Sequence, residues 1–332
     1  MKRHRVHHLT MAFTLTAPLL VVAGCDSAGT TGAAAGAGSR TIGVSFDLLN
    51  ATRQAEKAAI QKAAAAAGYQ TVFDVADQDA QKQASQIQDL VETQHVSAII
   101  AIAQDGRQIT SSIGLAKAHH VPFVAVDRAV ADQADVSFQV TSNPSGDGAM
   151  AAAQFMAEGR PLKVLELVGS LSDQNAIGRR DGFDKGLAGN AVVTIAGQVP
   201  TDWDPTQALD GTANALQQDP GIDAIFIPSD FLLPSVESAL KSAGRLYPLS
   251  DPKHVFIVTI DGDQNGCAAL KSGYIDADIA TPVDQFATDA ISAVGRALAG
   301  QSLTSKTTRT EGVTLNRTTF AAVSAQVWGC GS

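Results

Sequence analysis

The sequence lacks the residue patterns that several common classes of protein need. Its three cysteines form neither a CxxC motif nor the Cys/His spacing of a metal site, so we predict no metal and no cofactor. Beyond the first ten residues the histidines are few, and each precedes a predicted strand: His95, His119, His120 and His254. They form no Ser/His/Asp or Cys/His arrangement, and we therefore predict that the protein is not an enzyme.

Positive charge is also scarce. The chain carries 24 Lys and Arg against 33 Asp and Glu, a formal net charge of −9. Residues 1–24 contain three of the basic residues and no acidic one, so without them the charge is −12. A surface of this sign repels nucleic acid phosphates, and we predict no nucleic acid partner. The remaining length suffices for two packed domains.

The first 24 residues have the layout of an export signal, with a basic start, an apolar run over Met11–Ala23 and small residues before Cys25. The apolar run is shorter than the roughly 20 residues of a bilayer-spanning helix. The Val-Ala-Gly-Cys ending resembles the bacterial lipoprotein signal, in which the cysteine is lipidated. This resemblance implies an exported protein, in the periplasm or at the cell surface, anchored to the membrane through Cys25, with residues 25–40 as a flexible tether.

Two further cysteines, Cys267 and Cys330, lie in the remaining chain. In an exported protein such a pair suggests a disulfide, which would stabilise the fold by roughly 4 kcal/mol in the chain-entropy model. The alternative is two buried thiols, and the sequence leaves this choice open.

From residue 41 onward the chain alternates short apolar strands with amphipathic helices. In the first series the helices are predicted over 52–67 and near 108–118, and a third has Ile87, Leu90 and Val91 at helical spacing. The predicted strands of this series are 41–46, 69–76, 96–103 and 122–126. The alternation is typical of a doubly wound parallel sheet.

A second series repeats the pattern, with helices predicted near 146–158 and 234–243. Its predicted strands are 163–168, 192–196, 224–228, 255–260 and 276–280. Two series predict two sheets and hence two lobes. Ligands of open α/β sheets bind beyond the carboxyl ends of the strands, so the strand ends are where we expect the function.

Hydrogen-bonding side chains gather at those strand ends. The candidate ligand-binding residues among them are Asp47, Asp127, Arg128, Asp173, Asn175, Ser229, Asp230, Asp261 and Thr281, together with the indole of Trp203. Gln104, Asp105 and Asn265 also stand at predicted strand ends. Carboxylates accept and guanidinium donates, which suits the vicinal hydroxyls of a sugar, and an indole can cover the apolar face of a sugar ring. Paired carboxylates also leave open an exported glycosidase as an alternative.

Five segments of the chain resemble the periplasmic sugar-binding proteins of ABC transporters, of the type that includes ribose-, arabinose- and xylose-binding proteins. The segments are IGVSFDLLNATRQ, VPFVAVDRAV, SDQNA, TDWDP and VTIDGDQNG, within a resemblance that covers roughly residues 41–300. The resemblance implies a type 1 periplasmic-binding fold, in which two doubly wound lobes are joined by a hinge. It adds Arg53 to the ligand-binding residues listed above and implies that Trp203 packs on the sugar ring.

The same resemblance implies how the chain is divided and what it does. Lobe one would be 41–141 with 282–311, and lobe two 142–281 with 312–332, which puts both Cys267 and Cys330 in lobe two. A monomer would capture a monosaccharide or related polyol between the lobes and deliver it to an ABC permease. The alternative is a sensor that passes the signal of a bound ligand to a chemoreceptor or membrane kinase.

Departures from the family bear on the ligand. Ser229 stands before Asp230 where the family often has Asn, Thr281 replaces Gln or Lys, and Thr52 and Arg53 replace ring-stacking phenylalanines. We therefore expect a pentose or hexose other than simply ribose, with a xylose-like sugar favoured.

Overall fold

The computed structural model describes residues 40–132, 134–301 and 305–331. The predicted export signal over 1–24, the lipidation site Cys25 and all but the last residue of the predicted tether lie outside the described residues. Within the described part of the chain, no helix combines the length and the apolar character needed to cross a membrane.

The first sheet has the strand order β11-β5-β4-β3-β1-β2, and all of its strand pairs are parallel. Its strands are β1 (Thr41–Phe46), β2 (Gln70–Val75), β3 (Ala98–Ala101), β4 (Phe123–Asp127), β5 (Phe138–Ser142) and β11 (Thr307–Thr310). The central strands β1, β3, β4 and β5 are buried almost throughout, as parallel strands covered on both faces must be.

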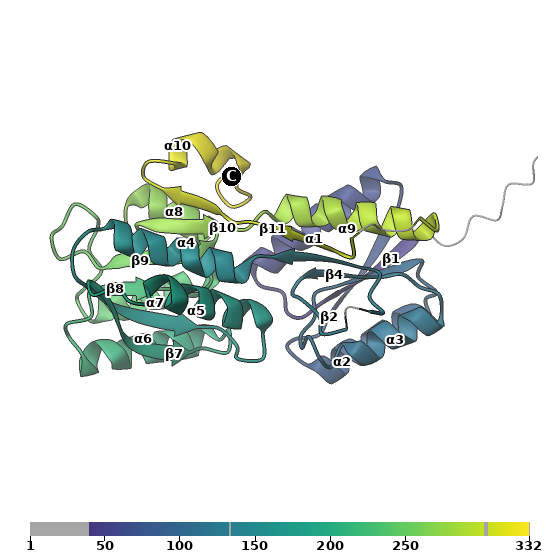
Figure 1. Ribbon diagram of the computed structural model, residues 1–332, viewed down its shortest axis with the longest axis horizontal. Helices are drawn as coiled ribbons and strands as arrows, with labels where there is room; N and C mark the ends of the chain where they lie inside the picture. Colours follow the sequence, from purple (N-terminus) through teal and green to yellow (C-terminus); the bar gives the residue numbers. More distant parts are fainter. Residues whose placement is uncertain (1–39, 133, 302–304, 332) are drawn as a thin grey trace, which may run out of the picture. The chain divides into compact units, whose positions relative to one another are not determined.

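Helices cover both faces of this sheet (Figure 1). The helices α1 (Ala51–Ala66) and α9 (Val283–Leu298) pack on one face, and α2 (Ala80–Glu92) and α3 (Thr110–Ala118) pack on the other. Asn50 and Asp79 cap the first turns of α1 and α2 by accepting from backbone N–H groups, which fixes where each helix begins. We call this sheet with its four helices lobe one.

The second sheet has the order β12-β10-β9-β8-β6-β7. Its strands are β6 (Leu162–Val168), β7 (Val193–Pro200), β8 (Ala224–Phe226), β9 (Phe256–Asp261), β10 (Ala277–Ala280) and β12 (Val313–Asn316). Only β12 runs antiparallel to its neighbour in this sheet of the described chain.

Helices cover this sheet as well, and together they form lobe two. One face carries α4 (Pro144–Ala157) and α5 (Gln174–Leu187), and the other carries α6 (Pro205–Gln218), α7 (Leu233–Ser242) and α8 (Gln264–Ser272). The 3₁₀ turns η1 (Asp230–Leu232) and η2 (Ser324–Gln326) and the short helix α10 (Phe320–Val323) complete the lobe. A Cβ at Gly148 of α4 would collide with the backbone of α5, so this glycine permits the close approach of the two helices.

The predicted fold class, two doubly wound α/β lobes, is confirmed. The sequence-based assignment missed the strands β5, β11 and β12. Within the described residues the chain crosses between the two sheets three times. It leaves the first sheet after β5, returns to it after β10, and leaves it again between β11 and β12.

Candidate functional site

A buried polar pocket lies where the carboxyl ends of the strands of both lobes meet. Lobe one contributes Asp47, Leu48, Asn50, Thr52, Arg53, Glu56, Asp127 and Arg128 to its lining. Lobe two contributes Asp173, Asn175, Arg179, Trp203, Ser229, Phe231 and Asp261, and Thr281 lines it after β10. The structure thus brings together all of the candidate ligand-binding residues except Asp230, and Arg53 with them. The strand-end residues Gln104, Asp105 and Asn265 are not part of the lining.

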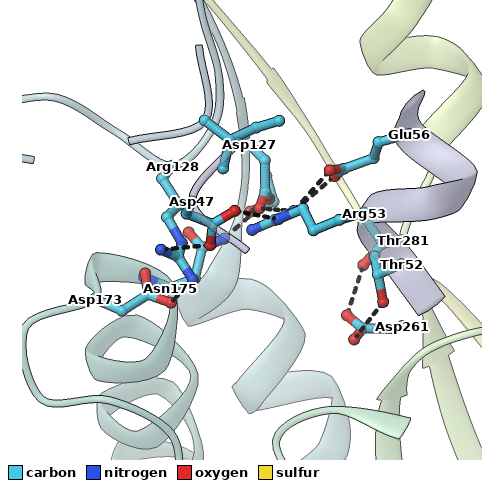
Figure 2. A network of polar contacts seen from close by, with 12 residues as sticks. Asp47, Thr52, Arg53, Glu56, Asp127, Arg128, Asp173, Asn175, Asp261 and Thr281 are labelled. Carbon is cyan, nitrogen blue, oxygen red and sulfur yellow. Dashed lines mark hydrogen bonds and ion pairs between the residues drawn. The ribbon is translucent and has the colours of Figure 1, made fainter. Parts of the chain in front are cut away.

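On the side of lobe one, a single guanidinium meets three carboxylates (Figure 2). Arg53, in the first turn of α1, donates from Nε to Asp47 at 3.0 Å, and its Nη1 lies 2.8 Å from carboxylate oxygens of Glu56 and Asp127. Burial works against the charge of Arg53, but the carboxylates keep its pKa well above its usual value. Burial raises the pKa of Glu56 to about 8, although Arg53 acts in the opposite direction.

Arg128, at the end of β4, connects this network to lobe two. Its Nη1 lies 2.8 Å from Asp47 Oδ2, and its Nη2 lies 2.8 Å from Oδ2 of Asp173, the residue that caps α5. A second link runs from Asn175 Nδ2, which donates to Asp127 Oδ1 at 2.9 Å. The two lobes therefore touch through charged and amide groups inside the pocket, as the sticks of Figure 2 show.

Asp261, at the end of β9, is the centre of a second network. Arg179 on α5 donates to its Oδ1 at 2.9 Å, and Ser229 donates to its Oδ2. Thr52 of lobe one donates to the same Oδ2 at 3.3 Å, and Thr281 to Oδ1 at 3.5 Å. The carboxylate of Asp261 thus accepts hydrogen bonds from both lobes.

Two of the strand-end residues, Asp127 and Asp261, have unusual backbone conformations. Asp127 has a φ of 60° and Asp261 a φ of 132°, in the range that side chains with a Cβ seldom adopt. Such a conformation persists only when the surrounding structure holds it, and it is found preferentially at ligand sites. Burial alone would raise the pKa of Asp127. The positive charges of Arg53, Arg179 and Arg128 outweigh this effect and hold the pKa below its ordinary value.

Trp203 forms an apolar wall of the pocket. It is 8% exposed, and its indole Nε1 donates to Asp173 Oδ2 at 2.9 Å. Its ring lies 6.0 Å from that of Phe231, centroid to centroid. A Cβ at Gly169 would collide with the indole, so the absence of a side chain there provides the space for the ring.

Asp230 does not lie on the pocket wall, which corrects its expected place among the ligand-facing residues. It is fully buried, and it accepts from Thr259 Oγ1 at 2.7 Å and from the backbone N–H of Asp263 at 2.6 Å. Its side chain therefore points back toward β9 and the turn that follows it. Burial and the nearby carboxylate of Asp278 raise the pKa of Asp230.

Sequence reasoning missed several pocket residues, and two of them are charged. Arg179 lies four residues after Asn175 on α5, and Glu56 lies three residues after Arg53 on α1. Residues at these spacings share one face of a helix. This spacing is the signal that could have added both residues to the predicted site.

Comparison with known proteins is consistent with this geometry. Residues 42–302 match the family model described as a periplasmic binding protein domain. The ribose import binding protein of Bacillus subtilis is 31% identical over 243 residues, which are 72% of this chain and 75% of the relative. A xylitol-binding protein of Mycolicibacterium smegmatis is 28% identical over 253 residues, 75% of this chain and 70% of the relative.

Solved structures share the fold. The periplasmic binding protein component of the arabinose ABC transporter from Shewanella sp. ANA-3 superposes with a TM-score of 0.79 at 22% identity, covering 85% of this chain and 93% of that one. A galactofuranose binding protein gives a TM-score of 0.78 at 21% identity, with 84% and 95% covered. At these identities the likeness concerns the fold alone.

Proposed function

The chain belongs to the periplasmic binding protein family, and we propose that it captures a monosaccharide or a related polyol between its two lobes and delivers it to an ABC permease. The observation that carries the proposal is the convergence of hydrogen-bonding groups from both lobes in one buried pocket with an aromatic wall. A sugar offers what this pocket accepts, because each hydroxyl both donates and accepts while the ring carbons present apolar C–H faces.

In the proposed mechanism the ligand enters between separated lobes, and closure surrounds it. The segments 41–141 with 282–311 and 142–281 with 312–332 move as the two lobes. Ligand hydroxyls take over some of the contacts that now join Arg128 to Asp173 and Thr52 to Asp261. Charge-assisted hydrogen bonds contribute about 1.5 to 3 kcal/mol each, offset by desolvation and ordering. A net binding free energy of about −8 kcal/mol, a micromolar Kd, is the expected outcome.

The proposed ligand is a five-carbon sugar or polyol, with a xylose-like sugar favoured. The curated relatives support this size, because their names refer to ribose, xylitol and apiose, which all have five carbons. Thr52 and Arg53, at the positions where the resemblance implies ring-stacking phenylalanines, line the lobe-one wall of the pocket with polar groups instead. The ligand-contacting set we propose is Asp47, Arg53, Asp127, Arg128, Asp173, Asn175, Arg179, Trp203, Ser229, Asp261 and Thr281.

The proposed setting is the outer side of a cell membrane, where lipidated Cys25 anchors a monomer close to its permease. No bond of the sugar is made or broken in this mechanism. The carboxylates that a glycosidase would need are engaged by arginines instead, since Asp47 and Asp127 contact Arg53 and Asp261 contacts Arg179.

A thermal-shift screen tests the proposal. The purified protein is heated with D-xylose, D-ribose, L-arabinose, D-apiose, xylitol, D-galactose and myo-inositol, and each hit is measured by calorimetry. A ligand that binds the native state alone raises the melting temperature. We expect one or two stereochemically related compounds to do so, with the shift lost in Arg128→Ala. No shift with any compound would contradict the proposal, and release of reducing sugar from a glycoside would replace it with the hydrolase alternative.

A further inference from the structure

The end of the described chain forms a strap, Val327–Cys330, that lies against the turn after β9. Cys330 is joined by a disulfide to Cys267 on α8, with the two Cα atoms 5.3 Å apart. Val327 is buried in the same apolar cluster as Cys267, on the face of lobe two that carries α6, α7 and α8. The strap is therefore fixed to lobe two at both of its ends.

Between these ends the strap contacts the backbone of the residue pair Asp261–Gly262. The indole Nε1 of Trp328 donates to the carbonyl oxygen of Asp261 at 3.1 Å. The N–H of Gly329 donates to the carbonyl oxygen of Gly262, also at 3.1 Å. Val327 packs closely on Gly262, because a Cβ added to Gly262 would lie only 2.7 Å from Cγ1 of Val327.

The turn that receives these contacts is one that needs support. Asp261 has a φ of 132° and Gly262 a φ of 74°, so two consecutive residues depart from ordinary backbone conformations. A residue other than glycine stays in such a conformation only where its neighbours hold it. From outside the strap, the backbone N–H of Thr281 also donates to the Asp261 carbonyl, at 2.9 Å. Trp328 and Thr281 thus both donate to this carbonyl.

Trp328 also reaches lobe one. Its ring packs against the apolar cluster formed by α1, α9 and the strands they cover, while its N–H bonds to lobe two. A single side chain therefore joins the core of one lobe to the turn that carries Asp261 in the other.

We propose that Trp328 is a positioning residue for the Asp261 carboxylate and that the strap Val327–Cys330 maintains the backbone conformation which aims this carboxylate into the pocket. The inference rests on the proposed function in one respect, that Asp261 binds the sugar. Through the hydrogen bond to its carbonyl oxygen, Trp328 affects ligand affinity without being one of the residues that line the pocket.

Hydrogen–deuterium exchange of the ligand-free full-length protein tests the strap without any sugar. Trp328→Phe keeps an aromatic ring and removes the N–H donor. The matched control is Gln326→Ala, which changes an exposed residue just before the strap. We expect faster exchange over residues 261–265 in the first variant and wild-type exchange in the second, with residues 123–128 unchanged in both. Wild-type exchange over 261–265 in Trp328→Phe would overturn the inference.

The double variant Cys267→Ser with Cys330→Ser provides the second route if Trp328→Phe fails to fold. It releases one end of the strap and leaves the indole in the chain. The same local rise in exchange over 261–265 is expected, and a rise confined to residues 266–272 and the C-terminal residues would contradict the strap's role.

Affinity for D-xylose, measured by calorimetry, tests the link to Asp261. Trp328→Phe is expected to weaken binding roughly two- to tenfold, the range for one lost hydrogen bond. In an Asp261→Asn background the same substitution should have a smaller effect, because Trp328 acts through that side chain. Equal effects in both backgrounds would overturn the positioning role. If D-xylose does not bind the wild-type protein, the proposed xylose-like ligand is at fault, the best ligand of the thermal-shift screen takes its place, and the exchange experiment still decides on the strap.

Discussion

Arg128 of lobe one and Asp173 of lobe two form an ion pair in the lining of the pocket, with Nη2 and Oδ2 2.8 Å apart. Both side chains are nearly inaccessible to solvent, at 6% and 2% exposure. Removing one partner of a buried pair leaves the other charge without compensation, which costs more than the loss of a surface pair. The proposed ligand site and the contact between the lobes therefore share the same two residues.

Asp173→Asn is expected to weaken sugar binding by 1 kcal/mol or more, about fivefold or greater, because it removes the charge that Arg128 meets. Asparagine still caps α5, so the helix should remain. Calorimetry with the best ligand of the thermal-shift screen measures the effect. The control is Asp181→Asn, whose pairing with Arg180 is partly exposed and should contribute little. Equal affinities in the two variants would contradict the assigned role of Asp173.

Gly169→Ala is expected to weaken binding by 1 kcal/mol or more, because the added methyl group displaces the Trp203 ring from the pocket wall. Gly114→Ala in α3 provides the control, since no atom outside its own helix lies within 4 Å of the new Cβ. That change should raise the free energy of unfolding by about 0.5 to 1 kcal/mol and leave affinity unchanged. Calorimetry and tryptophan fluorescence would report both results, and wild-type affinity in Gly169→Ala would rule out a contact between the ligand and Trp203.

The free energy of unfolding should fall as the pH rises from about 5 to 8, and Glu56→Gln should reduce the fall. Burial raises the pKa of Glu56 from 4.5 to about 8, so between these values the folded protein holds a proton that the unfolded chain has released. The buried Glu166 and Asp278, with pKa values also raised to about 8, add to the same trend. Urea unfolding across this pH range measures the slope. An unchanged slope in Glu56→Gln would refute the prediction.

Cys267 and Cys330 should be unreactive toward a thiol reagent in the denatured, unreduced protein, since the structure joins them. Replacing both with serine should lower the free energy of unfolding by about 4 kcal/mol in the chain-entropy model. Titration of thiols before and after reduction checks the bridge, and two reactive thiols before reduction would show that it is absent.

Cys25→Ser should move the protein from the membrane fraction to the soluble fraction of the cell envelope, because it removes the residue expected to carry the lipid. Fractionation and immunoblotting measure this, with Ser27→Ala as a neighbouring control. Continued membrane association of the Cys25 variant would exclude the anchor.

The sequence predicted the central strands and their polar ends because both have strong local signals. Runs such as Phe123–Val126 are buried on both faces and so are apolar throughout, and the charged residues that follow mark the strand end. The edge strand β11 has the sequence TTRT and is half-exposed, so it shows no apolar pattern that would distinguish it from a loop. β5 lacks the continuous apolar run of its neighbour β4, because the buried polar residues Gln139 and Thr141 alternate with Phe138 and Val140.

The rest of the site depends on contacts that a linear pattern does not carry. Arg179 enters the pocket only because α5 packs on the sheet of lobe two, from where its guanidinium reaches Asp261 at the end of β9. Asp230 carries the same strand-end signal as Asp261, yet η1 turns it back toward Thr259. Which of two neighbouring carboxylates faces a ligand is decided by tertiary structure, and the sequence pattern alone placed both in the pocket.

The three passages of the chain between the sheets have a consequence for how the molecule is assembled. β11 completes the edge of the first sheet beside β5, with Thr307 opposite Gln139, and β12 completes the second sheet beside β10. Neither lobe is a continuous piece of the chain, so a single proteolytic cut or a simple truncation yields no intact half. Pairings between residues so far apart in sequence raise the contact order and slow folding. During synthesis, each sheet receives an edge strand only after residues 307–316 have left the ribosome, so both sheets wait for that strand until all of their other strands have been made.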